Sequence, residues 1–213
     1  MRLLDSAPAA VLWDMDGLLV DSEPLWTVAE VELAEALGGT WTDAIKVACM
    51  GKRLDLAVPV MLEGLGVPAT PTAVRDAADL LLARMVVLLA EEVPVLPGVA
   101  ELLGQLAAAA VPQALVSSSF RVLVDAVLVR LDAPPFAVTL AGDEVTHAKP
   151  HPEPWLTAAG RLGVDPARCV VLEDSAAGVA SGLAAGCTVV AVGALGAAPP
   201  AGATGVPSLA ALL

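Results

Sequence analysis

From Val93 onward the chain alternates short apolar runs with longer segments of helical spacing. This alternation is typical of βαβ units, in which parallel strands are joined by helices that cover the faces of the sheet. Residues 9–13 form an earlier apolar run of the same kind, and it ends at a sharp polar loop. The chain is therefore expected to be an α/β protein built on a parallel sheet.

The spacing of apolar residues also predicts where the individual elements lie. Strands are predicted at 9–13, 113–116, 137–140, 169–172 and 188–192, and helices at 99–110, 120–131, 154–162, 176–185 and 208–213. The segment from Ser22 to Glu92 contains only helical patterns, which lie at 24–37, 54–65 and 72–89. This contrast indicates an all-helical insertion within the α/β chain.

Acidic residues outnumber basic ones, with 24 Asp and Glu against 11 Lys and Arg and a net charge of −13. This balance argues against a nucleic-acid partner, because contacts to its phosphates need Lys and Arg. A phosphorylated ligand would also be repelled at long range and needs a local cation where it binds. No residue from 175 to 213 is charged, but glycines divide that stretch into pieces shorter than the about 20 apolar residues of a membrane span. We expect no membrane partner.

The cysteines and the N-terminal residues indicate the cellular compartment in which the protein is expected. Cys49, Cys169 and Cys187 are widely spaced among apolar residues, so they suggest neither a disulfide framework nor a zinc site. The first residues do not have the form of a secretory signal. We expect a cytoplasmic protein, either a monomer or a weak homodimer.

Four polar clusters follow four of the predicted strands. They are Asp14-Met15-Asp16-Gly17, Ser117-Ser118-Ser119, Lys149-Pro150 and Glu173-Asp174. In an open α/β sheet the carboxyl ends of the strands share one edge, and ligands bind in the crevice there. Side chains that are far apart in the sequence are therefore expected to converge on one site.

The two aspartates of the first cluster suit a reaction with a carboxylate nucleophile and a separate acid/base. Asp14 can attack phosphorus, while Asp16 protonates the leaving oxygen and later activates water. A carboxylate and a phosphate dianion repel each other. Magnesium beside Glu173 and Asp174, together with the ammonium of Lys149, would offset that repulsion.

The serines after strand 113–116 offer hydrogen-bond donors to a phosphoryl group. Ser117 can donate its hydroxyl, and Ser118 or Ser119 can present backbone N–H groups at the start of the next helix. Each cluster also has an ordinary structural interpretation, since Asp-x-Asp-Gly suits a turn and Ser119 or Ser175 suits a helix cap. The order of the four clusters, each after a separate strand, favours the functional interpretation.

Taken together, the clusters resemble the motifs of the haloacid dehalogenase superfamily. The run 14–23 is similar to its first motif, Ser117 to its second, Lys149 with Pro150 to its third, and the run 173–178 to its fourth. The resemblance spans nearly the whole chain. It implies a Rossmann-like core of residues 1–21 and 93–213, with a helical cap domain inserted at 22–92.

The same resemblance implies roles for individual residues. Asp14 becomes an aspartyl-phosphate and Asp16 is the acid/base. Magnesium is held by Asp174, the Asp14 side chain and the Asp16 carbonyl, with Glu173 assisting. True dehalogenases lack the second aspartate, so Asp16 favours phosphoryl transfer and implies a magnesium-dependent phosphatase.

The insertion bears on the substrate. Superfamily members called β-phosphoglucomutases carry a His where Trp26 stands, and Trp cannot take or give a proton in that way. The runs 21–26 and 51–55 instead resemble bacterial sugar-phosphate phosphatases. We expect a small sugar or polyol phosphate as substrate, with a phosphomutase as the nearest alternative and a non-catalytic regulator as a further one.

Some charged residues have no clear assignment. Lys52 and Arg53 follow Gly51 in the insertion, and they either contact the substrate or are ordinary solvated charges. Ser118 is also expected to contact the substrate. His147 and His151 flank Lys149 but lack a third residue in a metal-ligand pattern. We interpret both histidines as loop residues.

Overall fold

The computed structural model describes residues 8–131 and 135–213, so residues 1–7 of the predicted core lie outside it. Its centre is a six-stranded sheet with the order β3-β2-β1-β4-β5-β6, in which all pairs are parallel. The strands are β1 (Ala10–Trp13), β2 (Gln113–Val116), β3 (Val138–Leu140), β4 (Cys169–Glu173), β5 (Thr188–Val192) and β6 (Thr204–Val206). The strand order reverses at β1, and this switch point is where open α/β sheets bind ligands.

The register of the central strands determines which side chains meet at the carboxyl edge. Trp13 pairs with Leu115 on one side and Leu172 on the other. β1 is buried along its whole length, and the Trp13 indole donates to the buried Gln113 Oε1 at 3.1 Å. The residues that follow β1, β2 and β4 therefore leave the sheet at the same level.

Helices cover both faces of the sheet, as expected for an α/β fold. They are α5 (Val99–Ala108), α6 (Arg121–Arg130), α7 (Glu153–Leu162) and α8 (Ala176–Ala184). Alternate residues of β1 point to opposite faces, so Val11 and Trp13 pack in the hydrophobic cluster that includes α5 and α6. Ala10 and Leu12 pack with α7 and α8 in a second cluster. The sheet is thus the middle layer of three.

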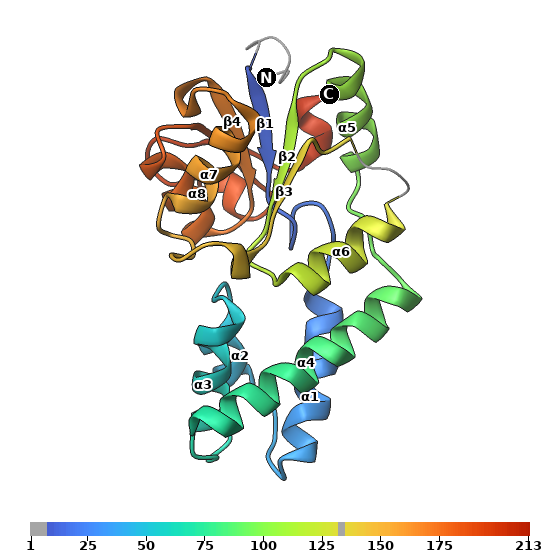
Figure 1. The fold of residues 1–213 in the computed structure, drawn as a ribbon, viewed down its shortest axis with the longest axis vertical. Coiled ribbons are helices and arrows are strands. Elements are labelled where there is room, and N and C mark those ends of the chain that lie inside the picture. The colour runs from blue at the N-terminus through green and yellow to red at the C-terminus, as the bar shows by residue number, and fades with distance from the viewer. Residues whose placement is uncertain (1–7, 132–134) are drawn as a thin grey trace.

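The inserted segment forms a group of helices beside the carboxyl edge of the sheet (Figure 1). These are α1 (Glu23–Ala36), α2 (Asp43–Cys49), α3 (Leu54–Gly64) and α4 (Pro71–Glu91), which we call the helical unit. α4 packs against α1 and α3 and also against α6 of the core. Near the two chain connections, Val20 forms an antiparallel bridge with Val95.

Most predicted elements are present with ends shifted by one or two residues, and the differences involve short segments. α2 was not predicted, because it has only seven residues; Thr42 begins it by accepting from the Ile45 N–H. β6 was also missed, since its three residues include a central glycine. The predicted last helix is a short 3-10 turn, Leu209–Leu212. Within the described residues, no helix is both long and apolar enough to cross a membrane.

Candidate active site

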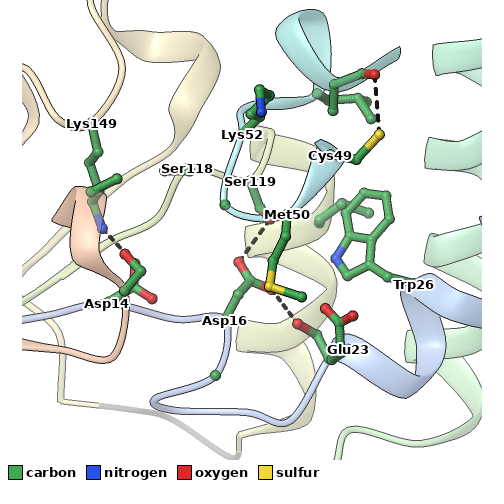
Figure 2. Close-up of a pocket in the computed structure, with 18 of the residues that line it drawn as sticks. Asp14, Asp16, Glu23, Trp26, Cys49, Met50, Lys52, Ser118, Ser119 and Lys149 are labelled. Carbon is green, nitrogen blue, oxygen red and sulfur yellow. Dashed lines mark hydrogen bonds and ion pairs between the residues drawn. The ribbon is translucent and has the colours of Figure 1, made fainter. Parts of the chain in front are cut away.

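A cavity of about 860 Å³ lies between the carboxyl edge of the sheet and the helical unit. Figure 2 shows Lys149 and Asp14 facing each other on the core side, with Asp16 between them and the Trp26 and Met50 side chains of the helical unit. The four predicted motifs all contribute to its wall. The expected convergence of the strand ends is therefore observed.

Asp14, Lys149 and Glu173 form a buried ion-pair network at the floor of the cavity. Lys149 Nζ lies 2.5 Å from Asp14 Oδ1 and 2.7 Å from Glu173 Oε1, and it also donates to the Val116 carbonyl at 3.1 Å. The Glu173 Oε2 atom accepts from the backbone N–H and the hydroxyl of Ser175, at 2.8 and 2.9 Å. Because both Glu173 oxygens are engaged, this residue acts mainly to hold the Lys149 ammonium in place.

The Lys149 ammonium also lies 4.3 Å from the centroid of the Trp155 ring, and Trp155 is fully buried. A cation above an indole face is attracted by the ring quadrupole, most strongly when both are desolvated. Burial alone would lower the pKa of Lys149, but the carboxylates of Asp14 and Glu173 outweigh it and raise that pKa. Lys149 is therefore a permanent positive charge beside Asp14.

Asp16 is held by three serine hydroxyls. Its Oδ1 atom accepts from Ser22 at 2.6 Å, and its Oδ2 atom accepts from Ser117 at 3.1 Å and Ser119 at 2.8 Å. The Ser119 N–H in turn donates to Ser117 Oγ at 2.8 Å. The carboxylate is thus oriented by donors that a phosphoryl oxygen can also accept from.

Two glycines allow the acidic loops to approach one another. Gly17 has φ +81°, and a Cβ there would lie 2.1 Å from Asp174 Oδ2. A Cβ on Gly178 would lie 1.6 Å from Glu173 Oε1. The glycines of the first and fourth motifs are therefore required by close packing against the acidic side chains.

Three carboxylates form a group that suits a divalent metal ion. Asp14, Glu173 and Asp174 each offer a carboxylate oxygen, and these atoms lie within 4.8 Å of one another. Burial raises the pKa of Asp14 well above its usual range, with Lys149 acting in the opposite direction. Burial, and then Glu173, raises the pKa of Asp174 to about 7. Such crowding of hard oxygen ligands fits Mg²⁺, whose charge would stabilise the ionised carboxylates.

The predicted substrate-binding residues have different surroundings. Ser118 and Lys52 line the cavity, where the Lys52 ammonium donates to the Ala48 carbonyl at 2.5 Å. Arg53 instead bridges to the core, since it donates to the carbonyls of Gly142 and Val145 at 3.0 and 3.2 Å. Arg53 thus links the helical unit to the loop after β3.

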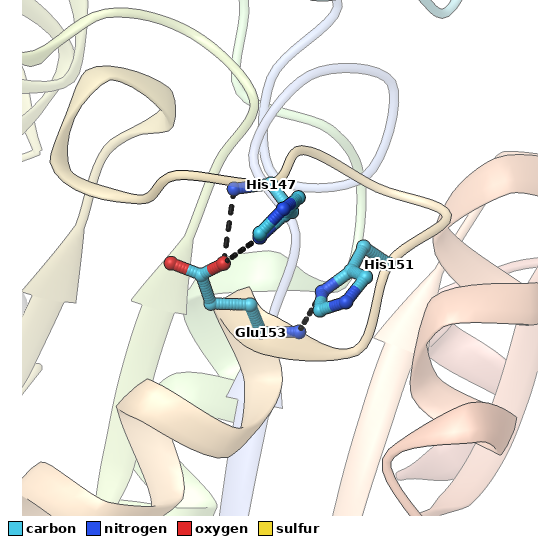
Figure 3. A group of neighbouring side chains, drawn as sticks. All are labelled: His147, His151 and Glu153. Atoms are coloured by element: carbon cyan, nitrogen blue, oxygen red, sulfur yellow. Dashed lines mark hydrogen bonds and ion pairs between the residues drawn. The ribbon is translucent and has the colours of Figure 1, made fainter.

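His147 and His151 lie on the loop that carries Lys149, with their rings stacked 4.4 Å apart (Figure 3). The Glu153 carboxylate lies 2.7 Å from His147 Nδ1 and accepts from the backbone N–H of His147 at 2.9 Å. His151 Nδ1 accepts from the Glu153 N–H at 3.2 Å. These contacts fix the path of the loop into α7. The expectation that the histidines lack a third ligand is wrong, because ligand atoms of His147, His151 and Glu153 lie within 4.8 Å of one another and form a second group of potential metal ligands.

Sequence reasoning missed several residues that touch the site. Ser22 was placed at a domain boundary, although its position within the run 14–23 of the first motif is a signal for a contact with Asp16. Ser119 was considered as a helix cap, yet its hydroxyl binds Asp16 and the cap residue of α6 is Phe120. Trp155 is fully buried in the core, and its ring also supports the Lys149 ammonium.

The fold and the site together define a class of protein. A buried carboxylate beside an ammonium, a second carboxylate held by hydroxyls and an acidic cluster lie at the switch point of an open α/β sheet. This combination is typical of hydrolases that work through carboxylate chemistry.

Comparison with known proteins agrees with this class. The family model described as haloacid dehalogenase-like hydrolase matches residues 8–186. The chain is 33% identical over 178 residues to hexitol phosphatase B of Escherichia coli (strain K12), which covers 83% of this chain and 79% of that protein. The chain therefore belongs to the haloacid dehalogenase-like hydrolases, as its four motifs predicted, and it is an enzyme.

Solved structures show the same fold. CbbY from Rhodobacter sphaeroides in complex with phosphate superimposes with a TM-score of 0.86 at 28% identity, covering 96% of each chain. A mutant of that protein in complex with xylulose 1,5-bisphosphate gives a TM-score of 0.82 at 26% identity, covering 95% of each chain. The Rossmann-like core with its helical insertion is thus confirmed as the architecture.

Proposed function

We propose that this hydrolase is a magnesium-dependent phosphatase that acts on a small sugar or polyol phosphate through an aspartyl-phosphate at Asp14. The observation that carries the proposal is the position of Asp14. Its carboxylate lies 2.5 Å from the Lys149 ammonium and within 4.8 Å of oxygens from Glu173 and Asp174. The names of relatives such as hexitol phosphatase B support the substrate class.

In the first step a carboxylate oxygen of Asp14 attacks phosphorus, and the bond from phosphorus to the substrate oxygen breaks. Asp16 donates a proton to that leaving oxygen, which departs as an alcohol. In the second step Asp16 takes a proton from a water molecule that attacks phosphorus. Inorganic phosphate then leaves, and Asp14 returns to its carboxylate form.

Serine hydroxyls and the lysine ammonium would hold the transferred phosphoryl group. Ser117 and Ser119 donate to Asp16 in the structure, and the same hydroxyls can turn to phosphoryl oxygens when substrate arrives. Lys149 supplies a fixed positive charge beside the attacking carboxylate. Exchange of these donors would free Asp16 to face the leaving oxygen.

Asp14 and Asp174 are the carboxylates with oxygens available for magnesium, and Glu173 assists by holding Lys149. When bound, Mg²⁺ supplies positive charge that offsets the repulsion between Asp14 and the phosphate. The proposed Asp16 carbonyl ligand stays a prediction.

The helical unit is proposed to act as a cap over this site. It supplies one wall of the cavity, and Arg53 joins it to the core through backbone carbonyls. Closure of such a cap excludes bulk water, so that only a positioned water reaches the phosphoryl-enzyme. We also propose a cytoplasmic location, which the three free, buried cysteines support; the oligomeric state stays a prediction.

A screen for phosphate release tests the proposed function. The full chain is incubated with a panel of sugar and polyol phosphates, with Mg²⁺ or with EDTA. We expect release that depends on Mg²⁺ and is lost in Asp14→Asn. A sugar 1-phosphate in the panel separates the alternative, because conversion to the 6-phosphate without phosphate release would identify a phosphomutase.

A further inference from the structure

The side of the cavity that the helical unit supplies carries a group of polar side chains from α1 and α2. Lys46 Nζ lies 2.8 Å from Glu23 Oε1 and donates to Thr27 Oγ1 at 3.0 Å. Glu23 and Lys46 both line the cavity. The ammonium of Lys46 is therefore already neutralised by a carboxylate before any substrate arrives.

Glu30 lies one turn further along α1 than Trp26 and also lines the cavity. It is half-buried, and burial, followed by repulsion from Glu23, raises its pKa to about 7. Lys46 is the group that opposes this shift, through charge attraction. Above pH 7, where Glu30 is mostly ionised, its carboxylate accepts hydrogen bonds from hydroxyls but repels an anion.

The charged side chains that line the cavity also disfavour a second phosphate. Its lining includes seven carboxylates: Asp14, Asp16, Asp21, Glu23, Glu30, Glu173 and Asp174. It includes three ammonium groups, those of Lys46, Lys52 and Lys149. Lys149 and Lys46 are paired with carboxylates, so Lys52 is the remaining ammonium in the described lining. One phosphate is compensated beside Asp14, and a second would meet mainly negative charge.

We infer that Glu30, with the Glu23–Lys46 pair, selects the end of the substrate opposite the phosphate that is cleaved. These side chains accept the uncharged, hydroxyl-bearing end of a monophosphate and reject a second phosphate. The inference rests on the proposed phosphatase activity and narrows its substrate class. Glu23 and Glu30 offer acceptors for several hydroxyls, while the Trp26 ring offers an apolar surface to carbon-bound hydrogens. The chain would thus differ from the CbbY mutant that was solved with a bisphosphate.

The test compares kcat/KM for glucose 6-phosphate and glucose 1,6-bisphosphate in the full chain with Mg²⁺. Acetyl phosphate, which has no sugar portion, reports the chemistry at Asp14. We expect the wild type to prefer the monophosphate by at least about tenfold, as one unscreened like charge in a cleft can produce. Glu30→Gln should lower that preference several-fold, and Lys46→Gln should raise it.

Glu35→Gln is the matched control, because Glu35 is an exposed acid of the same helix. If Glu30→Gln and Glu35→Gln have the same preference as the wild type, the inference is wrong although the phosphatase stands. A wild type that prefers the bisphosphate would also overturn it. If neither the sugar phosphates nor acetyl phosphate is hydrolysed, the proposed function is wrong, and so is the inference that rests on it.

Discussion

Lys149 and Asp14 are 135 positions apart in the chain, yet the Lys149 ammonium lies 2.5 Å from the Asp14 carboxylate. The parallel register of β1 with β2 and β4 brings the strand ends together, and the Trp155 ring lies beneath the ammonium. The contact is buried on both sides. The contact therefore contributes both to the stability of the core and to the charge balance of the site.

Removal of the Lys149 charge is expected to damage both properties. In Lys149→Met the carboxylates of Asp14 and Glu173 lose a partner 2.5 and 2.7 Å away. We expect a loss of about 3 kcal/mol in the free energy of unfolding at pH 8, measured by urea denaturation, because the buried charges are left uncompensated. Lys46→Met, which breaks a pair that is more exposed than the Lys149 pairs, should cost less. If both variants lost the same free energy of unfolding, this would contradict the conclusion that Lys149 is the buried counter-charge of Asp14 and Glu173.

Gly178 is expected to tolerate no side chain. A Cβ there would lie 1.6 Å from Glu173 Oε1, so Gly178→Ala must displace the residue that holds Lys149. We expect a loss of at least about 2 kcal/mol in the free energy of unfolding and reduced activity. Gly104→Ala is the control, because Gly104 lies in α5 with no atom within 4 Å of its added Cβ. That change should stabilise the helix by about 0.5–1 kcal/mol.

Magnesium affinity is expected to depend on Asp174. Asp174→Asn removes one carboxylate from the cluster formed with Asp14 and Glu173, and we expect the dissociation constant for Mg²⁺ to rise about 10- to 100-fold by titration calorimetry. Glu153→Gln changes the other group of potential metal ligands and should leave the affinity unchanged. The reverse pattern would place the cation at the histidine loop.

Glu30 is expected to make stability depend on pH. Its pKa is raised from 4.5 to about 7 in the folded chain, so between these values the folded state binds more protons than the unfolded state. The contribution of Glu30 to stability is therefore most favourable below pH 4.5 and declines as the pH rises through 7. Because Glu30 is partly exposed, we expect Glu30→Gln to be more stable than the wild type by only ~1 kcal/mol at pH 8. No gain at pH 8 would contradict the burial of its charge.

Much of the fold could be predicted because local pattern and tertiary environment agree. β2 and β5 have the predicted bounds, since continuous apolar runs are what a strand covered on both faces requires. α2 and β6 gave no comparable signal, because α2 is seven residues long and β6 is defined by its pairing with β5. Elements this short depend on their neighbours more than on their own sequence.

The core half of the site could also be predicted, because each motif lies at or after the end of a strand, although Lys149 comes after a longer loop. The residues that contact those motifs from other parts of the chain could not be predicted. Ser22 reaches Asp16 through the turn of the first loop, and Trp155 reaches Lys149 from α7. The Glu23–Lys46 pair joins two helices of the insertion, one of which was not predicted. Such contacts depend on tertiary packing that the sequence pattern does not define.

The most direct measurement is the location of the phosphoryl group during turnover. An Asp16→Asn variant lacks the proposed base for the second step, so it should accumulate the phosphoryl-enzyme when mixed with acetyl phosphate and Mg²⁺ and then quenched in acid. Peptide mass spectrometry should place the phosphate on Asp14, and the Asp14→Asn variant should carry none. Phosphate on another residue, or hydrolysis by wild-type enzyme that persists undiminished in Asp14→Asn, would contradict the assignment of Asp14 as nucleophile.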